Sequence, residues 1–212
     1  MPARSTGIIA LVFGLIAFSN HRYYNGDIIT FPTCDTSACG VTYEFVEDGF
    51  YDRDGHKGNE KEAMAVLQKI RAIYADLPND TECTVGVITL NVHQRDLIQK
   101  MLLKATDSEF GMKVDELVSV VNLESCQGKE WDYVILSPGF GYDKDRKFSM
   151  NFGALNREYG ENRLNVMLTR GRKKMFVITS IEPHMISNAR EQGTKDFKEF
   201  LMYARGEKTF DS

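Results

Sequence analysis

The fold is decided by a stretch near the middle of the chain, Thr84–Leu90 (TVGVITL), followed directly by Asn91–Ala105 (NVHQRDLIQKMLLKA). The first segment is short and rich in β-branched residues, which is typical of a buried strand. The second places apolar side chains on one face of a helix: Leu97, Ile98, Met101 and Leu102. A buried strand that leads into an amphipathic helix is the unit from which parallel sheets are built. We therefore expect a strand over 84–90 and a helix from Asp96 to about Ala105.

The same alternation continues along the chain. Further strands are expected at 41–46 (VTYEFV), 117–123 (LVSVVNL), 133–137 (YVILS) and 175–179 (MFVIT). A helix is expected from about Asn59 to Leu77, with Asn59 and Glu62 as a capping-box-like start, and a closing helix over 196–204. The pattern predicts an α/β fold in which a parallel sheet is flanked by helices on both faces.

The bulk composition is that of an ordinary globular protein and indicates one domain. The chain has 212 residues, of which 42% are hydrophobic and 26% charged. Its formal net charge of -4 and pI near 5.6 give no global signal for nucleic-acid binding, so such a site must be a local basic patch.

Two features near the N-terminus are open to a second interpretation. Cys34 and Cys39 could form half of a zinc site, but no second Cys/His pair lies nearby in sequence, and a loop with incidental, reduced cysteines is the simpler interpretation. The apolar stretch Gly7–Phe18 follows Arg4 and imitates the core of a secretory signal. It is too short to span a bilayer, and no small-x-small cleavage site follows it.

A polar turn containing glycine lies between two expected strands, at Glu124–Asp132 (ESCQGKEWD). Polar side chains at the strand ends of an open α/β sheet are where ligands usually bind. The alternative is a solvated turn in which Gly128 only caps a helix, and the segment alone does not decide between the two.

A basic helix is expected at Asn162–Lys174 (NRLNVMLTRGRKK). Arg163 and Arg170 are seven residues apart, which places them two turns apart on nearly the same face. A fixed guanidinium can bind phosphate oxygens and neutralise charge that develops during phosphoryl transfer. Alternatively, these arginines are solvated and complement the dipole at the helix end.

Taken together, these stretches resemble superfamily 1 DNA/RNA helicases, most closely the branch of the nonsense-mediated-decay helicases and large bacterial relatives. The resemblance covers most of the chain: 85–95 (VGVITLNVHQR) is similar to motif IV, 124–137 (ESCQGKEWDYVILS) to motif V and its extension, and 162–172 (NRLNVMLTRGR) to motif VI, while 15–32 and 49–63 resemble the lead-in of that domain. It implies the second RecA-like motor domain over residues 21–212, preceded by an atypical or truncated lead-in over 1–20.

The resemblance also implies roles for individual residues. Arg170 would be the arginine finger that reaches the γ-phosphate across an interdomain cleft, and Arg163 a second cleft arginine or a structural partner of motif V. The residues implied to bind nucleotide are Glu130, which would bond the ribose, Gln127 and Gly128, which would shape the cleft edge, and, as weaker candidates, Gln94 and Arg95. Those implied to contact the nucleic-acid backbone are Thr89, Asn91 and Ser125.

The departures from the helicase pattern bear on activity. The sequence contains no G-x-x-x-x-G-K-[ST] loop, because Gly128-Lys129 is followed by Glu130, and no acidic residue follows a hydrophobic strand as in a Walker B motif. The aromatic-arginine pair that relatives carry before LIAFSN is replaced by Gly7–Ala10 (GIIA). The resemblance thus implies ATP and Mg²⁺ only together with a partner P-loop domain, single-stranded DNA or RNA as partner, a cytoplasmic location, and neither a membrane nor a protein metal site.

Two other functions compete with a helicase half-motor. A non-catalytic binding module that kept the fold would explain the missing aromatic-arginine pair. A free-standing nuclease or hydrolase could use the scattered acids Asp52, Asp54, Glu60 and Glu62, but a solvated turn and a helix start explain these acids better.

Overall fold

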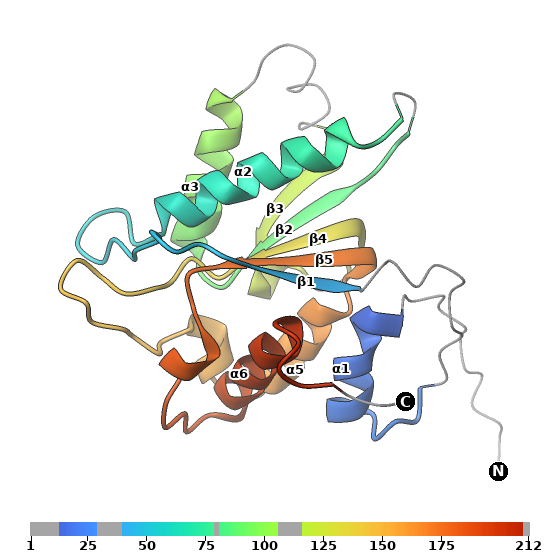
Figure 1. The fold of residues 1–212 in the computed structure, drawn as a ribbon, viewed down its shortest axis with the longest axis vertical. Helices are drawn as coiled ribbons and strands as arrows, with labels where there is room; N and C mark the ends of the chain where they lie inside the picture. The colour runs from blue at the N-terminus through green and yellow to red at the C-terminus, as the bar shows by residue number, and fades with distance from the viewer. Residues whose placement is uncertain (1–12, 29–39, 79–80, 106–115, 210–212) are drawn as a thin grey trace.

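The centre of the molecule is a five-stranded parallel sheet. The computed structural model describes residues 13–28, 40–78, 81–105 and 116–209. The strands are β1 (Val41–Phe45), β2 (Val85–Thr89), β3 (Val118–Asn122), β4 (Trp131–Ser137) and β5 (Gly171–Thr179). They lie in the order β1-β5-β4-β2-β3, and every neighbouring pair is parallel (Figure 1). All five expected strands are therefore confirmed, as is the parallel sheet.

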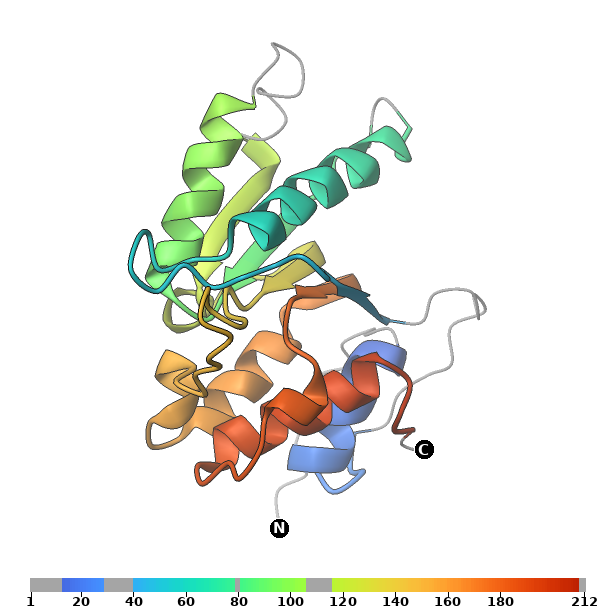
Figure 2. The same cartoon turned by 60° about the vertical axis from the view of Figure 1, so that its left-hand side comes forward.

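Helices cover both faces of the sheet, which confirms the expected RecA-like α/β fold (Figures 1 and 2). On one face, α2 (Glu60–Ala75) and α3 (Val92–Lys104) bury their apolar sides against β2 and β4. On the other face lie α1 (Phe13–Tyr23), α5 (Gly160–Leu168) and α6 (Gln192–Ala204). Three short 3₁₀ helices complete the described elements: η1 (Leu123–Ser125), η2 (Gly153–Asn156) and η3 (Pro183–Met185).

Two helix starts differ from the sequence-based expectation. α3 begins at Val92, four residues before the expected Asp96, because the Asn91 side chain caps it by accepting a 2.7 Å hydrogen bond from the backbone N–H of Gln94. α6 begins at Gln192 instead of 196. In both cases the first turn is mostly polar and lies outside the apolar pattern, although it contains buried residues, Gln94 in α3 and Thr194 in α6.

The start of α2 is confirmed in part. Asn59 is its N-cap and accepts a hydrogen bond from the backbone N–H of Glu62, as expected. Glu62, however, does not complete a capping box: its side chain is fully buried and accepts hydrogen bonds from the far ends of β4 and β5. A carboxylate predicted at a solvated helix start thus belongs to the interior.

α1 packs as part of the domain. Leu15 and Phe18 are buried in the same core cluster as α5 and α6. Arg22 and Tyr23 both bond to the buried carboxylate of Asp196 in α6. The expected domain boundary after residue 20 falls inside this helix, so the described part of the expected lead-in packs with the domain.

Some expectations concern residues outside the described part of the chain. These are the start of the apolar run, residues 7–12, and the two cysteines Cys34 and Cys39. Within the described residues, no helix has the length and apolar character needed to cross a membrane.

The parallel sheet has two edges that matter for function. At the amino edge β4 and β5 begin, and at the carboxyl edge β2, β4 and β5 end. Because β3 and β4 flank β2 on opposite sides and run in the same direction, the segment Leu123–Glu130 must cross from the carboxyl edge to the amino edge. Leu123 and Cys126 are buried in the core on the face of α1, α5 and α6, which shows the face that the segment crosses.

Candidate functional site

The amino edge brings the glycine turn and Arg170 together. The helix expected over 162–174 is shorter in the structure, because α5 ends at Leu168 and β5 begins at Gly171. Arg170 therefore lies between helix and strand, and the expectation that it shares a helix face with Arg163 is wrong. The turn Gln127–Glu130 directly precedes β4, and Arg170 directly precedes β5. The two strands are neighbours, and the backbone N–H of Trp131 donates to the carbonyl oxygen of Arg170 at 3.0 Å. Gly128 has a φ of +76°, and a Cβ at this position would meet no atom within 4 Å, so the turn is open on that side.

Backbone and hydroxyl oxygens of the same edge hold the Arg170 side chain in one orientation. Its Nε donates to the carbonyl oxygen of Val166 at 2.7 Å, and one terminal nitrogen donates to that of Lys129 at 3.1 Å. The other terminal nitrogen donates to the hydroxyl oxygen of Thr169 at 3.0 Å. A guanidinium has five N–H donors, so three bonds leave two donors for a further acceptor. The half-buried side chain has no acidic partner among the described residues.

Glu130 is exposed at the end of the same turn. One of its carboxylate oxygens lies 3.3 Å from Arg172, two residues after Arg170. The sequence analysis did not single out Arg172, although its place in the basic run was a usable signal. An exposed pair of this kind is weak, so Glu130 can exchange Arg172 for another hydrogen-bonding group at little cost.

Arg163 and Gln127 line a shared groove of about 440 Å³ between the crossing segment and α5. The complete lining is Leu123, Glu124, Gln127, Tyr159, Asn162, Arg163 and Val166. One terminal nitrogen of Arg163 donates to the carbonyl oxygen of Glu158 at 2.6 Å. The structure therefore brings together Gln127, Gly128, Glu130, Arg163 and Arg170, and it adds Glu124, Tyr159 and Asn162, which the sequence analysis missed.

Gln94 and Arg95 lie elsewhere, at the carboxyl edge, because α3 starts where β2 ends. Gln94 is fully buried: it accepts from the backbone N–H of Asn59 and donates to the oxygen atoms of Asn59 and Ser137. Arg95 bonds to its neighbour Asp96. The sheet thus separates these two residues from the Glu130 turn, and the structure does not assemble the five expected nucleotide-binding residues into one cluster.

The expected nucleic-acid contacts differ in their accessibility. Thr89 is fully buried, and its hydroxyl donates to the carbonyl oxygen of Asn91 at 2.7 Å. Asn91 is half-buried and caps α3. Ser125 is exposed on the crossing segment, next to Glu124, whose carboxylate bonds to Arg157 at 2.8 Å. Of the three, Ser125 is the side chain most open to a ligand in this arrangement.

The carboxyl edge is held together by a buried carboxylate. One oxygen of Glu62 accepts from the Ser137 hydroxyl and from the backbone N–H of Gly139, both at 2.7 Å. The other oxygen accepts from the backbone N–H of Ser180 at 3.1 Å. Burial raises the pKa of the Glu62 carboxyl to about 8, although these three donors oppose the rise. Glu62 thus joins the ends of β4 and β5 to the start of α2.

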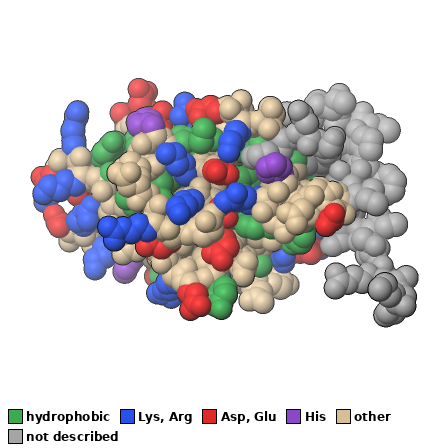
Figure 3. Space-filling view, turned by 90° about the horizontal axis from the view of Figure 1, so that it is seen from below, with side chains coloured by type: hydrophobic (Ala, Val, Ile, Leu, Met, Phe, Trp, Pro, Cys, Tyr) green, Lys and Arg blue, Asp and Glu red, His purple; other side chains and the backbone are tan. Residues whose placement is uncertain are grey.

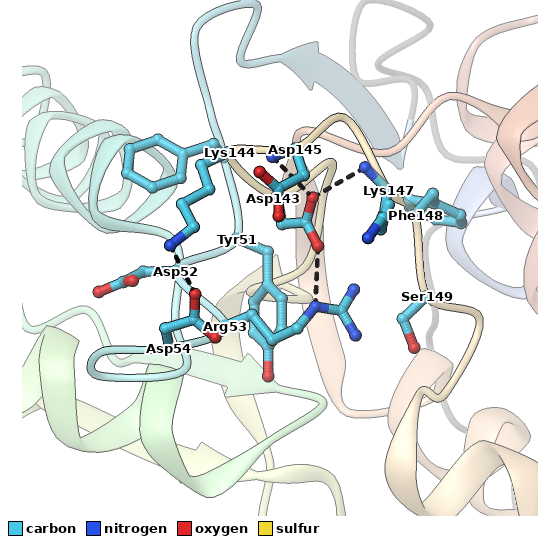
Figure 4. Close-up of a pocket in the computed structure, with 11 residues that line it drawn as sticks. Tyr51, Asp52, Arg53, Asp54, Asp143, Lys144, Asp145, Lys147, Phe148 and Ser149 are labelled. Carbon is cyan, nitrogen blue, oxygen red and sulfur yellow. Dashed lines mark hydrogen bonds and ion pairs between the residues drawn. The ribbon is translucent and has the colours of Figure 1, made fainter.

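A larger pocket of about 550 Å³ lies between two loops at the carboxyl edge, 49–58 and 139–150 (Figure 4). Two ion pairs line it: Arg53 pairs with Asp143 at 2.8 Å, and Lys144 pairs with Asp54 at 2.7 Å. Asp52 accepts hydrogen bonds from the backbone N–H groups of Gly55 and His56, as a turn residue does. These acids tie the loops together, and no group of three or more His, Cys, Asp or Glu in the described chain could hold a metal ion.

Charge is mixed over the face formed by α1, α5 and α6. In the view of this face, Lys and Arg side chains are interspersed with Asp and Glu (Figure 3). Any nucleic-acid contact on this face therefore depends on individual side chains and not on one continuous basic patch.

The sheet order and the helices on both faces define a RecA-like α/β domain. Residues 15–182 match the sequence model of an AAA domain family, and the chain belongs to that family. It is 30% identical over 200 residues to a Mycoplasma genitalium protein described as an uncharacterized ATP-dependent helicase, and equally to its homologue in Mycoplasma pneumoniae. These matches cover 89% of this chain but only 17% of each of the two relatives, so the chain spans a small part of their length.

Proposed function

We propose that this domain is the second motor domain of a superfamily 1 DNA/RNA helicase and supplies Arg170 as the arginine finger for ATP hydrolysis. The observation that carries the proposal is the placement of Arg170. Its guanidinium is fixed beside the Gln127–Glu130 turn and keeps two N–H donors for a further acceptor. A fixed cation at the rim of a domain can stabilise charge that develops on a phosphoryl group bound by another domain.

The rest of the ATP site comes from a partner domain in this proposal. The 212 residues contain no P-loop, and the described residues offer no acidic cluster for Mg²⁺. The partner therefore holds the phosphates and the metal ion, while Glu130 and Gln127 shape the near side of the cleft. Ser125 and Asn91 would contact a single nucleic-acid strand, and the buried Thr89 would position Asn91 through its hydrogen bond to the Asn91 carbonyl oxygen. A cytoplasmic location belongs to the same proposal.

The proposal predicts that the isolated chain does not hydrolyse ATP and that activity requires a P-loop domain. The test is steady-state ATP hydrolysis by the chain alone, by a P-loop motor domain of the same family alone, and by the two joined through a linker. We expect the joined protein to be active and Arg170→Ala to lower kcat by about 10³-fold or more. Arg170→Lys should restore only part of the rate, because lysine lacks the planar fork of donors.

Arg172→Ala is the matched control. It removes a neighbouring arginine whose carboxylate partner is exposed, and kcat should change by less than about threefold. Helicase-like hydrolysis by the chain alone, abolished by Arg170→Ala, would contradict the proposal. Equal effects of the two substitutions in the joined protein would contradict it too.

A further inference from the structure

Tyr159 has a backbone conformation that a bulky residue rarely adopts. It precedes α5 with φ +60° and ψ 28°, in the left-handed region that favours glycine. The backbone packs closely next to this residue, at the start of α5. A Cβ at Gly160 would meet the carbonyl oxygen of Leu155 at 2.2 Å, and a Cβ at Gly193 of α6 would meet the carbonyl carbon of Gly160 at 2.7 Å. The backbones of η2, α5 and α6 thus approach one another closely, which leaves little room for the backbone next to them to change its conformation.

The Tyr159 side chain makes no contact within the described ranges of the domain that would explain why a tyrosine stands at this position. Its residue surface is 59% exposed, the highest value among the described aromatic residues. In the described part of the chain, no hydrogen bond, ring contact or cation–π contact involves this side chain. Other tyrosines are anchored by their hydroxyls, as Tyr43 is by the carbonyl oxygen of Ile181 and Tyr74 by that of Cys83. An exposed, unanchored ring on a strained backbone contributes little to folding.

The surroundings of the ring have the chemistry of a nucleotide subsite. Tyr159 shares the 440 Å³ groove with Arg163, one helical turn further on, and with the exposed amide of Gln127. The groove is within the size range of small-ligand sites. Its one acidic side chain, Glu124, is paired with Arg157 at 2.8 Å, which weakens its repulsion of an anion.

The groove also leads toward Arg170. Val166 lines the groove, and its carbonyl oxygen accepts the hydrogen bond from Nε of Arg170. Tyr159 thus precedes α5, Arg163 lies in its first turn and Arg170 follows its end, while the amide of Gln127 lines the same groove from the crossing segment. Aromatic rings stack on any nucleobase, and guanidinium groups bind phosphate oxygens.

We propose that Tyr159 stacks on a nucleobase held in this groove, with Gln127 beside the base and Arg163 toward its phosphate. The proposal rests on the nucleotide-binding role proposed above for the amino edge, and it assigns a binding residue that the family resemblance does not imply. The base can belong to a free nucleotide or to a single strand, and the two sources are distinguished by experiment.

Photo-crosslinking of the full chain tests the contact directly. One arm uses 8-azido-ATP, the other a single-stranded oligonucleotide carrying 5-iodouracil, and the labelled residue is identified by mass spectrometry. We expect label on Tyr159 in one of the two arms. Label from 8-azido-ATP would show that the base belongs to a free nucleotide, and label from the oligonucleotide would show that it belongs to a single strand. Label on other residues only, or no label in either arm, would overturn the proposal.

Substitutions separate a binding role from a structural one. Tyr159→Phe keeps the ring and should bind as the parent chain does. Tyr159→Gly should weaken binding by about tenfold for the kind of ligand that crosslinks to Tyr159. Binding is measured with trinitrophenyl-ATP or with a fluorescein-labelled oligonucleotide. The melting temperature should meanwhile stay unchanged or rise by about 2–4 °C, since glycine relieves the positive φ. A fall in both binding and melting temperature would show that the ring is structural and would overturn the proposal.

Arg170→Ala keeps the two proposals apart. It should leave the label on Tyr159 in place while it abolishes hydrolysis in the joined protein. Labelling of Tyr159 together with full hydrolysis by Arg170→Ala would sink the arginine-finger proposal and leave the base contact standing. If Tyr159 is not labelled but Arg170→Ala abolishes hydrolysis in the joined protein, the base contact is wrong and the arginine-finger proposal stands.

Discussion

At the scale of single residues, Glu62 shows how a side chain can escape a sequence pattern. Its position three residues after Asn59 is that of a capping-box acid, yet it is fully buried and accepts three hydrogen bonds from residues 75 to 118 positions away. The local pattern fits both placements. Only the packing of β4 and β5 over the start of α2 decides that the carboxyl group is inside.

This burial predicts a pH-dependent stability. The pKa of Glu62 rises from an ordinary 4.5 to about 8 on folding, so the folded state holds the proton more tightly than the unfolded state. The stabilisation is complete below pH 4.5 and is lost as the pH rises toward 8, with a slope of up to about 1.4 kcal/mol per pH unit. Glu62→Gln removes this titration.

Urea unfolding between pH 5.5 and 8.5 checks the prediction. The free energy of unfolding of the parent chain should fall relative to that of Glu62→Gln as the pH rises. Parallel curves for the two proteins would mean that Glu62 is ionised throughout this range and that its three donors outweigh its burial.

At the scale of elements, the apolar patterns predicted the five strands and the helices α2, α3, α5 and α6, but neither the helix α1 nor the starts of α3 and α6. Asn91 could have been recognised as an N-cap, since asparagine before a polar first turn is a common helix start. The displaced start matters for the site. It places Gln94 in the first turn of α3, where its side chain is buried, and because β2 ends at Thr89 this turn lies at the opposite edge from Gln127 and Glu130.

Contacts between α1 and α6 give a second prediction. The carboxylate of Asp196 is 1% exposed and accepts from Arg22, Tyr23 and Gln192. Asp196→Ala should lower the free energy of unfolding by about 2 kcal/mol or more, because it leaves these donors without their acceptor. Hydrogen exchange of the α1 amides should accelerate at the same time.

Arg157→Ala is the control for that experiment. It breaks an ion pair of similar length in which both side chains are largely exposed, and it should cost under about 1 kcal/mol without changing exchange in α1. Equal costs for the two substitutions would show that Asp196 does not fasten α1 to the domain.

At the scale of the whole molecule, the alternation of strands and helices predicted a parallel sheet covered on both faces. The order of the strands in the sheet could not be predicted from this alternation. That order decides which polar residues meet. Arg170 and Gln127 come together because β5 and β4 are neighbours, and Arg95 is kept apart because it follows the end of β2. Residue types and spacings contain neither fact, since both depend on pairing between distant segments.

The mixed surface charge predicts a modest dependence of nucleic-acid binding on salt. With a net charge of -4 and no continuous basic patch on the face in Figure 3, we expect about two to four phosphate contacts. The logarithm of the association constant for a single-stranded oligonucleotide should then fall with log salt at a slope of about -1.4 to -2.8. Fluorescence anisotropy between low and physiological salt measures it, and an absence of binding at low salt would favour the alternative of a protein-interaction module.

The segment Leu123–Glu130, which crosses the sheet from β3 to β4, is only just long enough to connect the two strands. From the end of β3 at Asn122 to the start of β4 at Trp131 it has eight residues, 123 to 130, three of them in η1. It must traverse two interstrand spacings of about 4.8 Å each and, because Asn122 is level with Ser137, the six residue steps from Ser137 back to Trp131, roughly 22 Å on the diagonal. The segment is not extended: Leu123–Ser125 form η1, and Cys126–Lys129 form a turn closed by a 3.2 Å hydrogen bond from the backbone N–H of Lys129 to the carbonyl oxygen of Cys126. With these two turns it reaches little further than the distance it must span. Two of its side chains, Leu123 and Cys126, are held in the core, and the segment cannot be shortened by two residues without pulling β3 or β4 out of register.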